Sequence, residues 1–508
     1  MLMLVLEIMA SINYIGCMSL TRKVAYNTIV QIVGRVITTA TSLVLVASLT
    51  RYLGVSGFGS YTTIFAYTAF LAVLADFGFF NVLVREIATK QREQEKVLSN
   101  IFSVRILFAL AVYAVGLIIA FFIGSYSIEI KYGIAIITIA QFWLTLNSTL
   151  VGVFQAHLRM DKAVITDVLG RIVTLIFVLL AISAKLSLLA IISAYIIGNL
   201  INLVLSVAIA SQYIKLRLSW DYSYWRYLAK ITVPMGLLTI VGWVYFHADM
   251  VILSLLRDEY EVGIYGASYK IMEILLALPA IFTGAIFPIF SRYFVEKNKR
   301  LSSIFQQSFN FLVIACIPLA IIIFMLAKPI ISFIAGGQFI AASAPGLLFW
   351  GQPATAVLTL QILVFALVLS FISHLFRMAV IAIGEQGKLA ISTVVLMVIN
   401  IVLNLVFVPR YSYLAAATIT VLGEFLILLF PIMIIAKSGI RLPSLTLFPK
   451  ILLSSVFMVG VILVFDSLSL IPLAILSTVS YFITLYSIGG IPRDTIQEIL
   501  YYKKSGQV

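Results

Sequence analysis

The chain has 508 residues, of which 62% are hydrophobic and only 11% are charged, and its net charge is +14. Ordinary soluble domains carry roughly 25% charged residues, so this composition excludes a water-soluble globular protein. A positive charge of this size often marks nucleic-acid binding, but membrane proteins also concentrate Lys and Arg in their cytoplasmic loops. The basic residues lie mostly in the loops on one side of the predicted membrane. We therefore attribute the positive charge to membrane topology and expect no nucleic-acid partner.

Residues 1–20 include the apolar run MLMLVLEIMA, which Glu7 interrupts and no basic segment precedes. A secretory signal peptide normally begins with a basic segment. We therefore expect a dispensable N-terminal extension, with Met18 as a candidate start of the protein. Cys17 and Cys316 are the only cysteines, so no disulfide framework or thiolate metal site is predicted.

Apolar windows recur along the whole chain. A membrane-spanning helix needs about 20 mostly apolar residues. The windows predict an all-α polytopic membrane protein with about 14 transmembrane helices. Six predicted spans lie at 28–50, 60–82, 102–123, 133–154, 165–183 and 188–210. Eight more lie at 231–256, 265–290, 308–327, 357–382, 390–408, 414–436, 449–465 and 471–489.

The polar stretch 211–230 mixes charges with aromatic residues, as an interfacial helix would, and it divides the chain. Segment 328–350 is apolar but contains Gly336, Gly337 and Pro345, so we expect a re-entrant or interfacial piece there. The predicted domains are an extension at 1–20, an N-lobe at 21–210, a cytoplasmic linker at 211–230, a C-lobe at 231–436 and a C-terminal helix pair with its tail at 437–508.

Alternating the loops between the two sides of the membrane places most of the 34 basic residues on one side. The loops on the opposite side carry only Arg51, Lys131, Lys185, Arg257, Lys328 and Arg410. By the positive-inside rule, we expect both termini in the cytoplasm and the protein in the cell membrane. The motifs GFGSY at 57–61 and VGIYG at 262–266 each open a helix, which suggests an internal repeat or coincidental Gly-Tyr pairs.

Charged residues inside the spans are candidate functional groups, because each costs roughly 2.5–3.5 kcal/mol to insert at mid-bilayer. The candidates are Arg35, Asp76, Arg105, Asp167, Arg171, Asp249, Lys270, Glu273, Arg377 and Glu424. Arg35 and Asp76 lie at similar depths on consecutive spans, which predicts an ion pair or a shared polar cavity. Asp249 and Lys270 also lie at similar depths on consecutive spans, nearer the outer face, which again predicts a pair.

Other candidates have partners within one helix. Asp167 and Arg171 are four residues apart, and Lys270 and Glu273 are three apart, so each couple can neutralise itself.

Arg105 is close to the membrane interface, where a long side chain can reach water. Arg377 follows His374 without a carboxylate on its own helix, so it suits an anionic ligand or a partner on another helix. Glu424 stands alone and suits proton or cation coupling, or hydrogen bonds to neighbouring helices.

Several catalytic patterns are missing from the sequence. It contains no GxxxxGK[ST] phosphate loop, and its three histidines, His157, His247 and His374, form no metal-binding pattern, so we predict neither a bound metal nor a cofactor. Asn147 begins the sequon NST, but inside a span, where glycosylation is not expected. The outer loops are short, which argues against an enzyme with an outer-face active site.

Three segments carry a family resemblance. Residues 30–88 contain the pattern R-x-LG-x-x-x-FG-x-Y followed by D-x-G, supplied by Arg51, Leu53, Gly54, Phe58, Gly59, Tyr61, Asp76 and Gly78. Residues 247–292 add Asp249, Gly263, Tyr265, Tyr269 and Pro288 in the order expected for two later helices. Residues 399–424 form a third match, although Leu414 precedes Ala415 where Gly-Ala is usual. Together they resemble the polysaccharide exporters of the multidrug/oligosaccharidyl-lipid/polysaccharide flippase superfamily.

The resemblance implies two six-helix lobes around a central cavity, with the last two helices at the side. It implies that an oligosaccharide linked to a polyprenyl carrier moves from the cytoplasmic to the outer leaflet, with membrane lipids and glycan-assembly enzymes as partners. Cationic residues facing the cavity, Arg35, Arg171, Arg377 and Lys270, would bind the phosphate or pyrophosphate. Asp76, Asp249, Glu273 and Glu424 would be coupling or ion-pair carboxylates, with proton or sodium coupling.

The sequence is also compatible with two other functions. A multidrug or cation antiporter of the same superfamily would favour a cavity of carboxylates and aromatic residues. A membrane-embedded transferase acting on the same lipid carrier would need an exposed catalytic carboxylate or a metal site.

Overall fold

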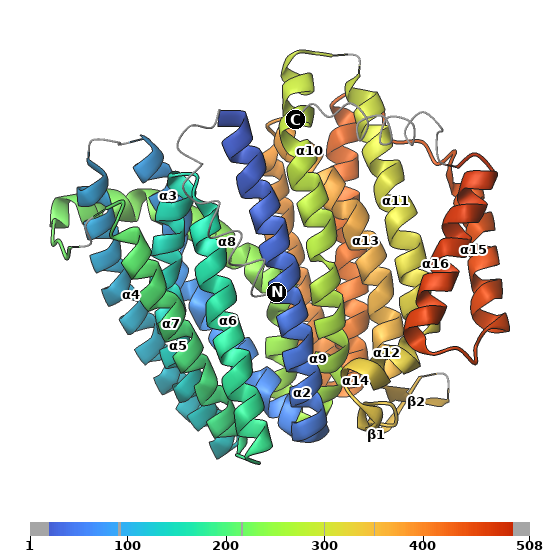
Figure 1. Cartoon of the computed structure of the whole chain (residues 1–508), viewed down its shortest axis with the longest axis horizontal. Coiled ribbons are helices and arrows are strands. Elements are labelled where there is room, and N and C mark those ends of the chain that lie inside the picture. Colours follow the sequence, from blue (N-terminus) through green and yellow to red (C-terminus); the bar gives the residue numbers. More distant parts are fainter. Residues whose placement is uncertain (1–19, 90–92, 215–216, 299, 350, 491–508) are drawn as a thin grey trace. The chain divides into compact units, whose positions relative to one another are not determined.

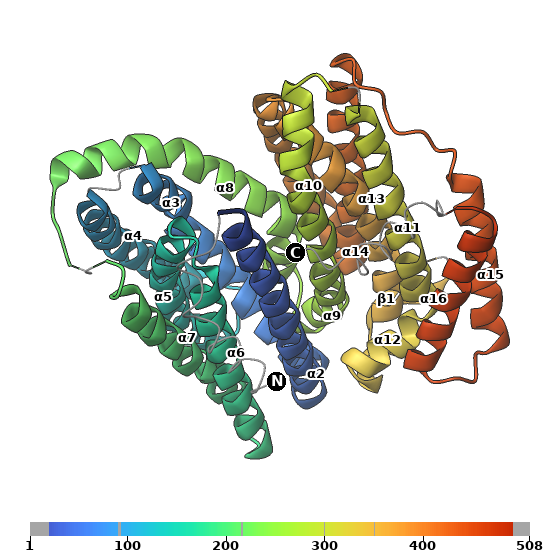
Figure 2. The same ribbon diagram turned by 45° about the horizontal axis from the view of Figure 1, so that its top comes forward.

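The computed structural model describes residues 20–89, 93–214, 217–298, 300–349 and 351–490, so the extension predicted at 1–20 falls outside it except for the last residue. Contacts divide the chain into two compact units, Met1–Gly263 and Ile264–Val508. Figures 1 and 2 label the elements of both units.

The first unit is a bundle of long helices. It contains α2 (Leu20–Asp76), α3 (Phe79–Thr89), α4 (Gln94–Phe122), α5 (Ile128–Ala156), α6 (Met160–Ser183), α7 (Leu188–Ala210), α8 (Tyr222–Leu256) and the start of α9 (Glu259–Leu275). Helix α5 packs against α7 and α2, and α6 packs against α7 and α2. Figure 2 shows α8 running across one edge of the bundle.

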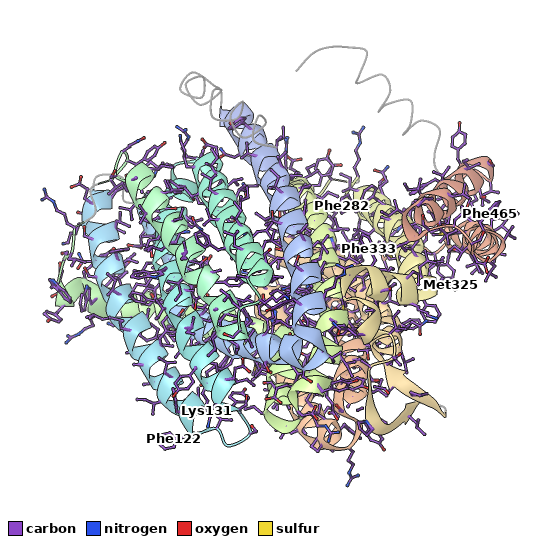
Figure 3. The ribbon with its side chains drawn as sticks, turned by 60° about the horizontal axis from the view of Figure 1, so that its bottom comes forward. Phe122, Lys131, Phe282, Met325, Phe333 and Phe465 are labelled. Atoms are coloured by element: carbon purple, nitrogen blue, oxygen red, sulfur yellow. The ribbon has the colours of Figure 1, made fainter. Side chains whose placement is uncertain are left out.

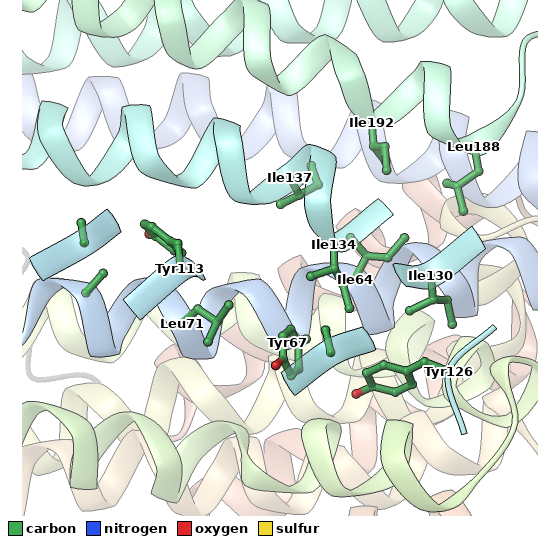
Figure 4. Close-up of a cluster of buried hydrophobic side chains, with 13 residues drawn as sticks. Ile64, Tyr67, Leu71, Tyr113, Tyr126, Ile130, Ile134, Ile137, Leu188 and Ile192 are labelled. Carbon is green, nitrogen blue, oxygen red and sulfur yellow. The ribbon is translucent and has the colours of Figure 1, made fainter. Parts of the chain in front are cut away.

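A buried cluster joins α2, α4, α5 and α7 in this unit. Ile64, Leu71, Ile134 and Ile192 are at most 4% exposed and meet between the helices, as Figure 4 shows. Tyr67 lies in the same cluster and satisfies its hydroxyl by donating to the Gly116 carbonyl at 2.7 Å. The core of this unit thus consists of packed apolar side chains, and the buried Tyr67 hydroxyl among them is hydrogen-bonded.

Helix α2 contains two predicted spans in one helical element. The two parts meet at Gly54, whose φ of 72° is readily adopted only by glycine. The second part ends at Asp76, and the chain then passes through left-handed residues Phe77 (φ 39°) and Gly78 (φ 77°) before α3 begins. The predicted span 60–82 is therefore interrupted near its end.

The two repeat motifs meet at a pair of glycines. A Cβ atom on Gly59 would lie 1.6 Å from the Glu259 carbonyl oxygen, and one on Gly263 would lie 2.1 Å from the Val55 carbonyl oxygen. Backbone cannot yield as a flexible side chain can, so both positions require glycine. The matched motifs thus form a close contact between the start of α9 and the second part of α2.

The predicted linker at 211–230 is bound to the first unit. Helix α8 begins inside it at Tyr222, with the Asp221 side chain accepting from the Tyr224 N–H at 3.0 Å as an N-cap. Tyr224 and Tyr227 donate to the Glu86 carboxylate of α3 at 3.2 and 3.0 Å. Because α8 packs on α2, α3 and α4, the division between the units falls at 263/264, one helix later than the linker.

The second unit is also mainly helical. It contains most of α9, then α10 (Ala277–Val295), α11 (Leu301–Met325), α12 (Ala327–Ile334), the 3-10 turn η3 (Gly337–Phe339), β1 (Ser343–Phe349), β2 (Gln352–Thr355), α13 (Ala356–Ala382), α14 (Gln386–Lys437), α15 (Phe448–Val464) and α16 (Leu470–Ser487). Helix α13 packs against α14, α11 and α10, and α15 packs against α16.

The segment predicted to be re-entrant or interfacial forms a short helix and a β-hairpin. Strands β1 and β2 pair antiparallel, with an irregularity between Ser343 and Leu348. The Tyr413 hydroxyl accepts from the Ala344 N–H at 3.0 Å and donates to the Ala354 carbonyl, so it bridges both strands. Tyr413 follows Ser412, whose φ of 49° marks the kink that joins the two spans of α14.

Eleven helices in the described part of the chain are long and apolar enough to cross a membrane. Two of them, which contain α2 and α14, each join two predicted spans across a kink. The apolar helix α15 is shorter, with 17 residues. Counting the two kinked helices twice and adding α15 accounts for the fourteen predicted spans. Large apolar side chains project outward, such as Phe122 at 85% and Phe333 at 58% exposure (Figure 3). The chain is thus an all-α polytopic membrane protein, apart from the hairpin.

Candidate functional site

A pocket of about 360 Å³, lined by both polar and apolar residues, lies within the first unit, between α2, α5 and α6. Its lining residues are Gln31, Gly34, Arg35, Thr38, Leu144, Asn147, Ser148, Val151, Met160, Ala163, Val164 and Asp167. A Cβ atom on Gly34 would lie 2.3 Å from a methyl group of Val164, so glycine lets α2 approach α6 closely here. The pocket volume is within the range of sites for small ligands or headgroups.

A single asparagine on α2 bonds the turn between two other helices that line the pocket. Asn27 donates to the Leu158 carbonyl at 2.6 Å and accepts from the Met160 N–H at 2.8 Å. These two bonds attach α2 to the turn between α5 and α6, where Leu158 has a left-handed φ of 55°. Gln31, one turn further along, lines the pocket.

The pocket contains an unpaired cation. Arg35 is exposed, and within the described residues its guanidinium makes no ion pair. Asp167, on the α6 wall, instead binds Arg171 at 3.0 Å, which confirms their predicted pairing. Because Arg171 is already balanced by its own helix, Arg35 is the pocket residue best able to bind an anion.

A buried ion pair adjoins the pocket. Arg105 is 1% exposed and donates to the Asp76 carboxylate, to Thr149 at 3.1 Å and to Ser148 at 2.6 Å. Of the two alternatives predicted for Arg35 and Asp76, the ion pair is therefore wrong, and the shared polar cavity stays a prediction. The prediction that Arg105 reaches water is also wrong. Arg35 and Asp76 lie at similar depths in their predicted spans, but their side chains point in different directions. The position of a residue along a span predicts its depth and not the neighbour toward which it points.

Ser148 connects the ion pair to the pocket, because it lines the pocket and accepts from Arg105. In the sequence, Asn147, Ser148 and Thr149 form the sequon NST, where glycosylation is not expected. Three consecutive polar residues inside an apolar span are themselves a signal for a polar site, since polar residues in spans usually face a cavity or another helix.

The second unit holds the remaining predicted cations. Lys270 binds Glu273 at 2.8 Å on its own helix, as predicted. Arg377 donates to the imidazole of His374 at 3.3 Å, and the buried Glu424 accepts from Ser373 at 3.3 Å. Glu424 also interacts electrostatically with Arg377. It therefore has a charged neighbour on another helix, although its own helix offers none.

The predicted residues thus form separate groups. Arg35 and Asp167 line the pocket in the first unit, whereas Lys270, Arg377 and Glu424 belong to the second. A single cavity formed by all four predicted cations stays a prediction, as does the pairing of Asp249 with Lys270, because these two residues belong to different units. Asp249 is 3% exposed. Among the described residues, no three His, Cys, Asp or Glu side chains gather as metal ligands.

Two family models match the sequence. The model described as "Polysaccharide biosynthesis protein" covers residues 22–294, more than half of the chain. The model described as "MatE" covers residues 234–406. The first match includes the whole pocket and the buried ion pair.

One protein sequence and several solved structures are also similar to this chain. The probable low-salt glycan biosynthesis flippase Agl15 of Haloferax volcanii is 20% identical over 73% of this chain and 75% of its own length. The lipid II flippase MurJ, solved in an inward closed conformation, gives a TM-score of 0.73 at 16% identity, over 93% of this chain and 100% of that one. An inward-facing multidrug resistance MATE family transporter gives 0.57 at 14% identity, over 82% and 100%.

At these identities the solved structures show a shared fold. Together with the model match over 22–294, they confirm the resemblance seen in the sequence. The chain therefore belongs to the polysaccharide biosynthesis protein family and is a multi-pass membrane protein of the multidrug/oligosaccharidyl-lipid/polysaccharide flippase superfamily.

Proposed function

We propose that this protein translocates a lipid-linked oligosaccharide, carried on a polyprenyl phosphate or pyrophosphate, from the cytoplasmic to the outer leaflet by alternating access. The translocated glycan would serve surface polysaccharide or glycoprotein assembly. Family membership supports this proposal, as does the similarity to a glycan biosynthesis flippase over 73% of the chain.

The observation that carries the proposal is the unpaired Arg35 in a pocket of a membrane-embedded unit. A cation costs free energy in such a setting unless an anion balances it. Guanidinium groups bind phosphate through two parallel hydrogen bonds, so a phosphate-bearing headgroup suits Arg35 better than a neutral or cationic molecule does.

Loop charges orient the proposed site. If the basic loops face the cytoplasm, the start of α2, the end of α5 and the start of α6 all lie on the cytoplasmic side. The pocket would then take its ligand from the cytoplasmic leaflet of the cell membrane, with both termini inside. Glycan-assembly enzymes on that side would supply the ligand.

Translocation in this scheme makes and breaks no covalent bond. The sugars and phosphate would cross in water while the polyprenyl chain stays in lipid, and access would alternate between the two sides of the membrane. Arg171, Arg377 and Lys270 would contribute positive charge along this path. Asp249 and Glu424, both buried, are the carboxylates that we propose for proton or sodium coupling.

A reconstituted flipping assay tests the function. Proteoliposomes carry a fluorescent polyprenyl diphosphate-linked sugar, and exposure of the label to an impermeant quencher reports its transfer between leaflets. We expect wild-type protein to transfer the lipid, Arg35→Ala to lose most of this activity and Arg35→Lys to keep part of it. Arg292→Ala is the matched control, because Arg292 is an exposed cation in a surface pair with Glu296 and should transfer at the wild-type rate. Equal transfer by Arg35→Ala and wild type would contradict the proposal.

The alternative is a multidrug or cation antiporter, which the MatE match over 234–406 specifically favours. Such a protein should expel ethidium from proteoliposomes when a proton or sodium gradient is applied. Gradient-driven ethidium efflux without any transfer of the lipid-linked sugar would establish this alternative.

A further inference from the structure

Asn147 on α5 lines the pocket, but its side-chain oxygen has no hydrogen-bond partner among the described residues. The residue is 3% exposed. A buried polar atom left unpaired destabilises a protein by roughly 1–3 kcal/mol, so native structures contain few of them. A cavity beside such an atom can hold a ligand that completes its hydrogen bonding.

The neighbouring polar groups on α5 are already engaged. The Ser148 hydroxyl donates to the Thr145 carbonyl at 2.9 Å and accepts from Arg105 at 2.6 Å. Thr149 accepts from Arg105 at 3.1 Å. Asn147 is therefore the residue on this wall with hydrogen-bonding capacity to spare.

A hydrogen-bond partner for this oxygen must be a donor, because an amide oxygen only accepts hydrogen bonds. A phosphate diester or an ionised phosphate offers acceptors alone, so the group that suits Arg35 cannot pair with the Asn147 oxygen. A sugar hydroxyl or the N–H of an acetamido group can. The two residues lie on different helices lining one pocket, and each suits a different part of a sugar phosphate.

We propose that Asn147 is a specificity-determining residue that recognises the sugar attached directly to the phosphate, by accepting a hydrogen bond from its hydroxyl or acetamido N–H. The inference rests on the proposed function and deepens it, since it assigns the headgroup, not the glycan chain, to this pocket. A volume of about 360 Å³ is near the lower limit of ligand sites and suits one sugar with its phosphate. The terminal amide torsion is broad, so the oxygen can turn toward a ligand without movement of α5.

The test compares two ligands on full-length protein in lipid nanodiscs. One is a polyprenyl phosphate bearing a single N-acetylhexosamine, and the other is the same polyprenyl phosphate without a sugar. We expect Asn147→Leu to bind the sugar-bearing lipid roughly tenfold more weakly and the bare lipid with unchanged affinity. Thermal stability should not fall, because leucine removes an unpaired polar group of similar size.

Asn202→Leu is the matched control. Asn202 is also 3% exposed, also has an unpartnered side-chain oxygen, and lies on α7 away from the pocket lining. This variant should bind both lipids as the wild type does. The same loss in Asn202→Leu would show a general packing effect and overturn the inference.

The remaining outcomes separate the inference from the proposed function. If wild-type protein binds neither lipid, the proposed function fails. If wild type binds both and Asn147→Leu loses both equally, or loses stability, Asn147 has a structural role and the inference alone fails. If Asn147→Leu instead changes only the sodium dependence of binding, the amide oxygen is a cation ligand, which also overturns the inference.

Discussion

Arg105 of α4 donates to the Asp76 carboxylate at the end of α2, and this ion pair is held inside the first unit with Arg105 almost fully buried. The pair stands directly before the left-handed residues Phe77 and Gly78, where α2 gives way to α3. It therefore joins the end of one helix to α4 and, through Ser148, to the wall of the pocket.

Asp76→Ala should destabilise the protein strongly. Arg105 would keep its buried charge without a carboxylate, and breaking a buried pair in this way typically costs about 3–5 kcal/mol. The double variant Asp76→Leu, Arg105→Leu should lose less stability than Asp76→Ala, because no uncompensated charge remains. Thermal unfolding of purified protein followed by tryptophan fluorescence measures both, and equal stability of Asp76→Ala and wild type would disprove the role of the pair.

Gly59→Ala should fold poorly or lose much of its stability. The added methyl group would meet the Glu259 carbonyl at 1.6 Å, so α2 and α9 must separate. Gly242→Ala in α8 is the control, because a Cβ atom there meets nothing within 4 Å, and alanine in a helix is favoured over glycine by up to about 1 kcal/mol. Expression level and melting temperature should fall for the first variant and hold or rise for the second.

Asn27→Ala should loosen the attachment of α2 to the turn between α5 and α6. The substitution removes the two hydrogen bonds that attach α2 to the turn between α5 and α6, at a cost of about 1–2 kcal/mol. Hydrogen exchange at the Met160 N–H should accelerate, since its acceptor is lost. Gln31→Ala removes only a bond within α2 and should leave that exchange rate unchanged. Unaltered exchange in Asn27→Ala would show that the turn is held by other contacts.

Tyr413→Phe should release the β-hairpin. The lost hydroxyl bridges Ala344 of β1 and Ala354 of β2, so backbone exchange in both strands should rise together. Tyr411→Phe provides a matched control, because Tyr411 is 53% exposed and lies two residues earlier in α14. If both variants exchange alike, the hairpin does not depend on this hydroxyl.

The correct ion-pair predictions concern residues close together on one helix, and the wrong one concerns residues on separate helical segments. The pairs Asp167–Arg171 and Lys270–Glu273 were predicted correctly because their spacing on one helix brings their side chains together. The pairing of Arg35 with Asp76 was wrong, since it required knowledge of which helix faces meet. Glu424 shows the same limit, because its partner Ser373 comes from another helix.

The sequence by itself determined that this is an all-α membrane protein of about 14 helices and which family it belongs to. These properties follow from apolar window length, from loop charge and from the order of local motifs, all of which can be read along one dimension. Only the tertiary structure decided that Arg105 neutralises Asp76, that Arg35 keeps a free charge in a pocket and that Asn147 lacks a partner beside it. Partners on separate helices depend on the rotation and packing of whole helices, which no local pattern specifies.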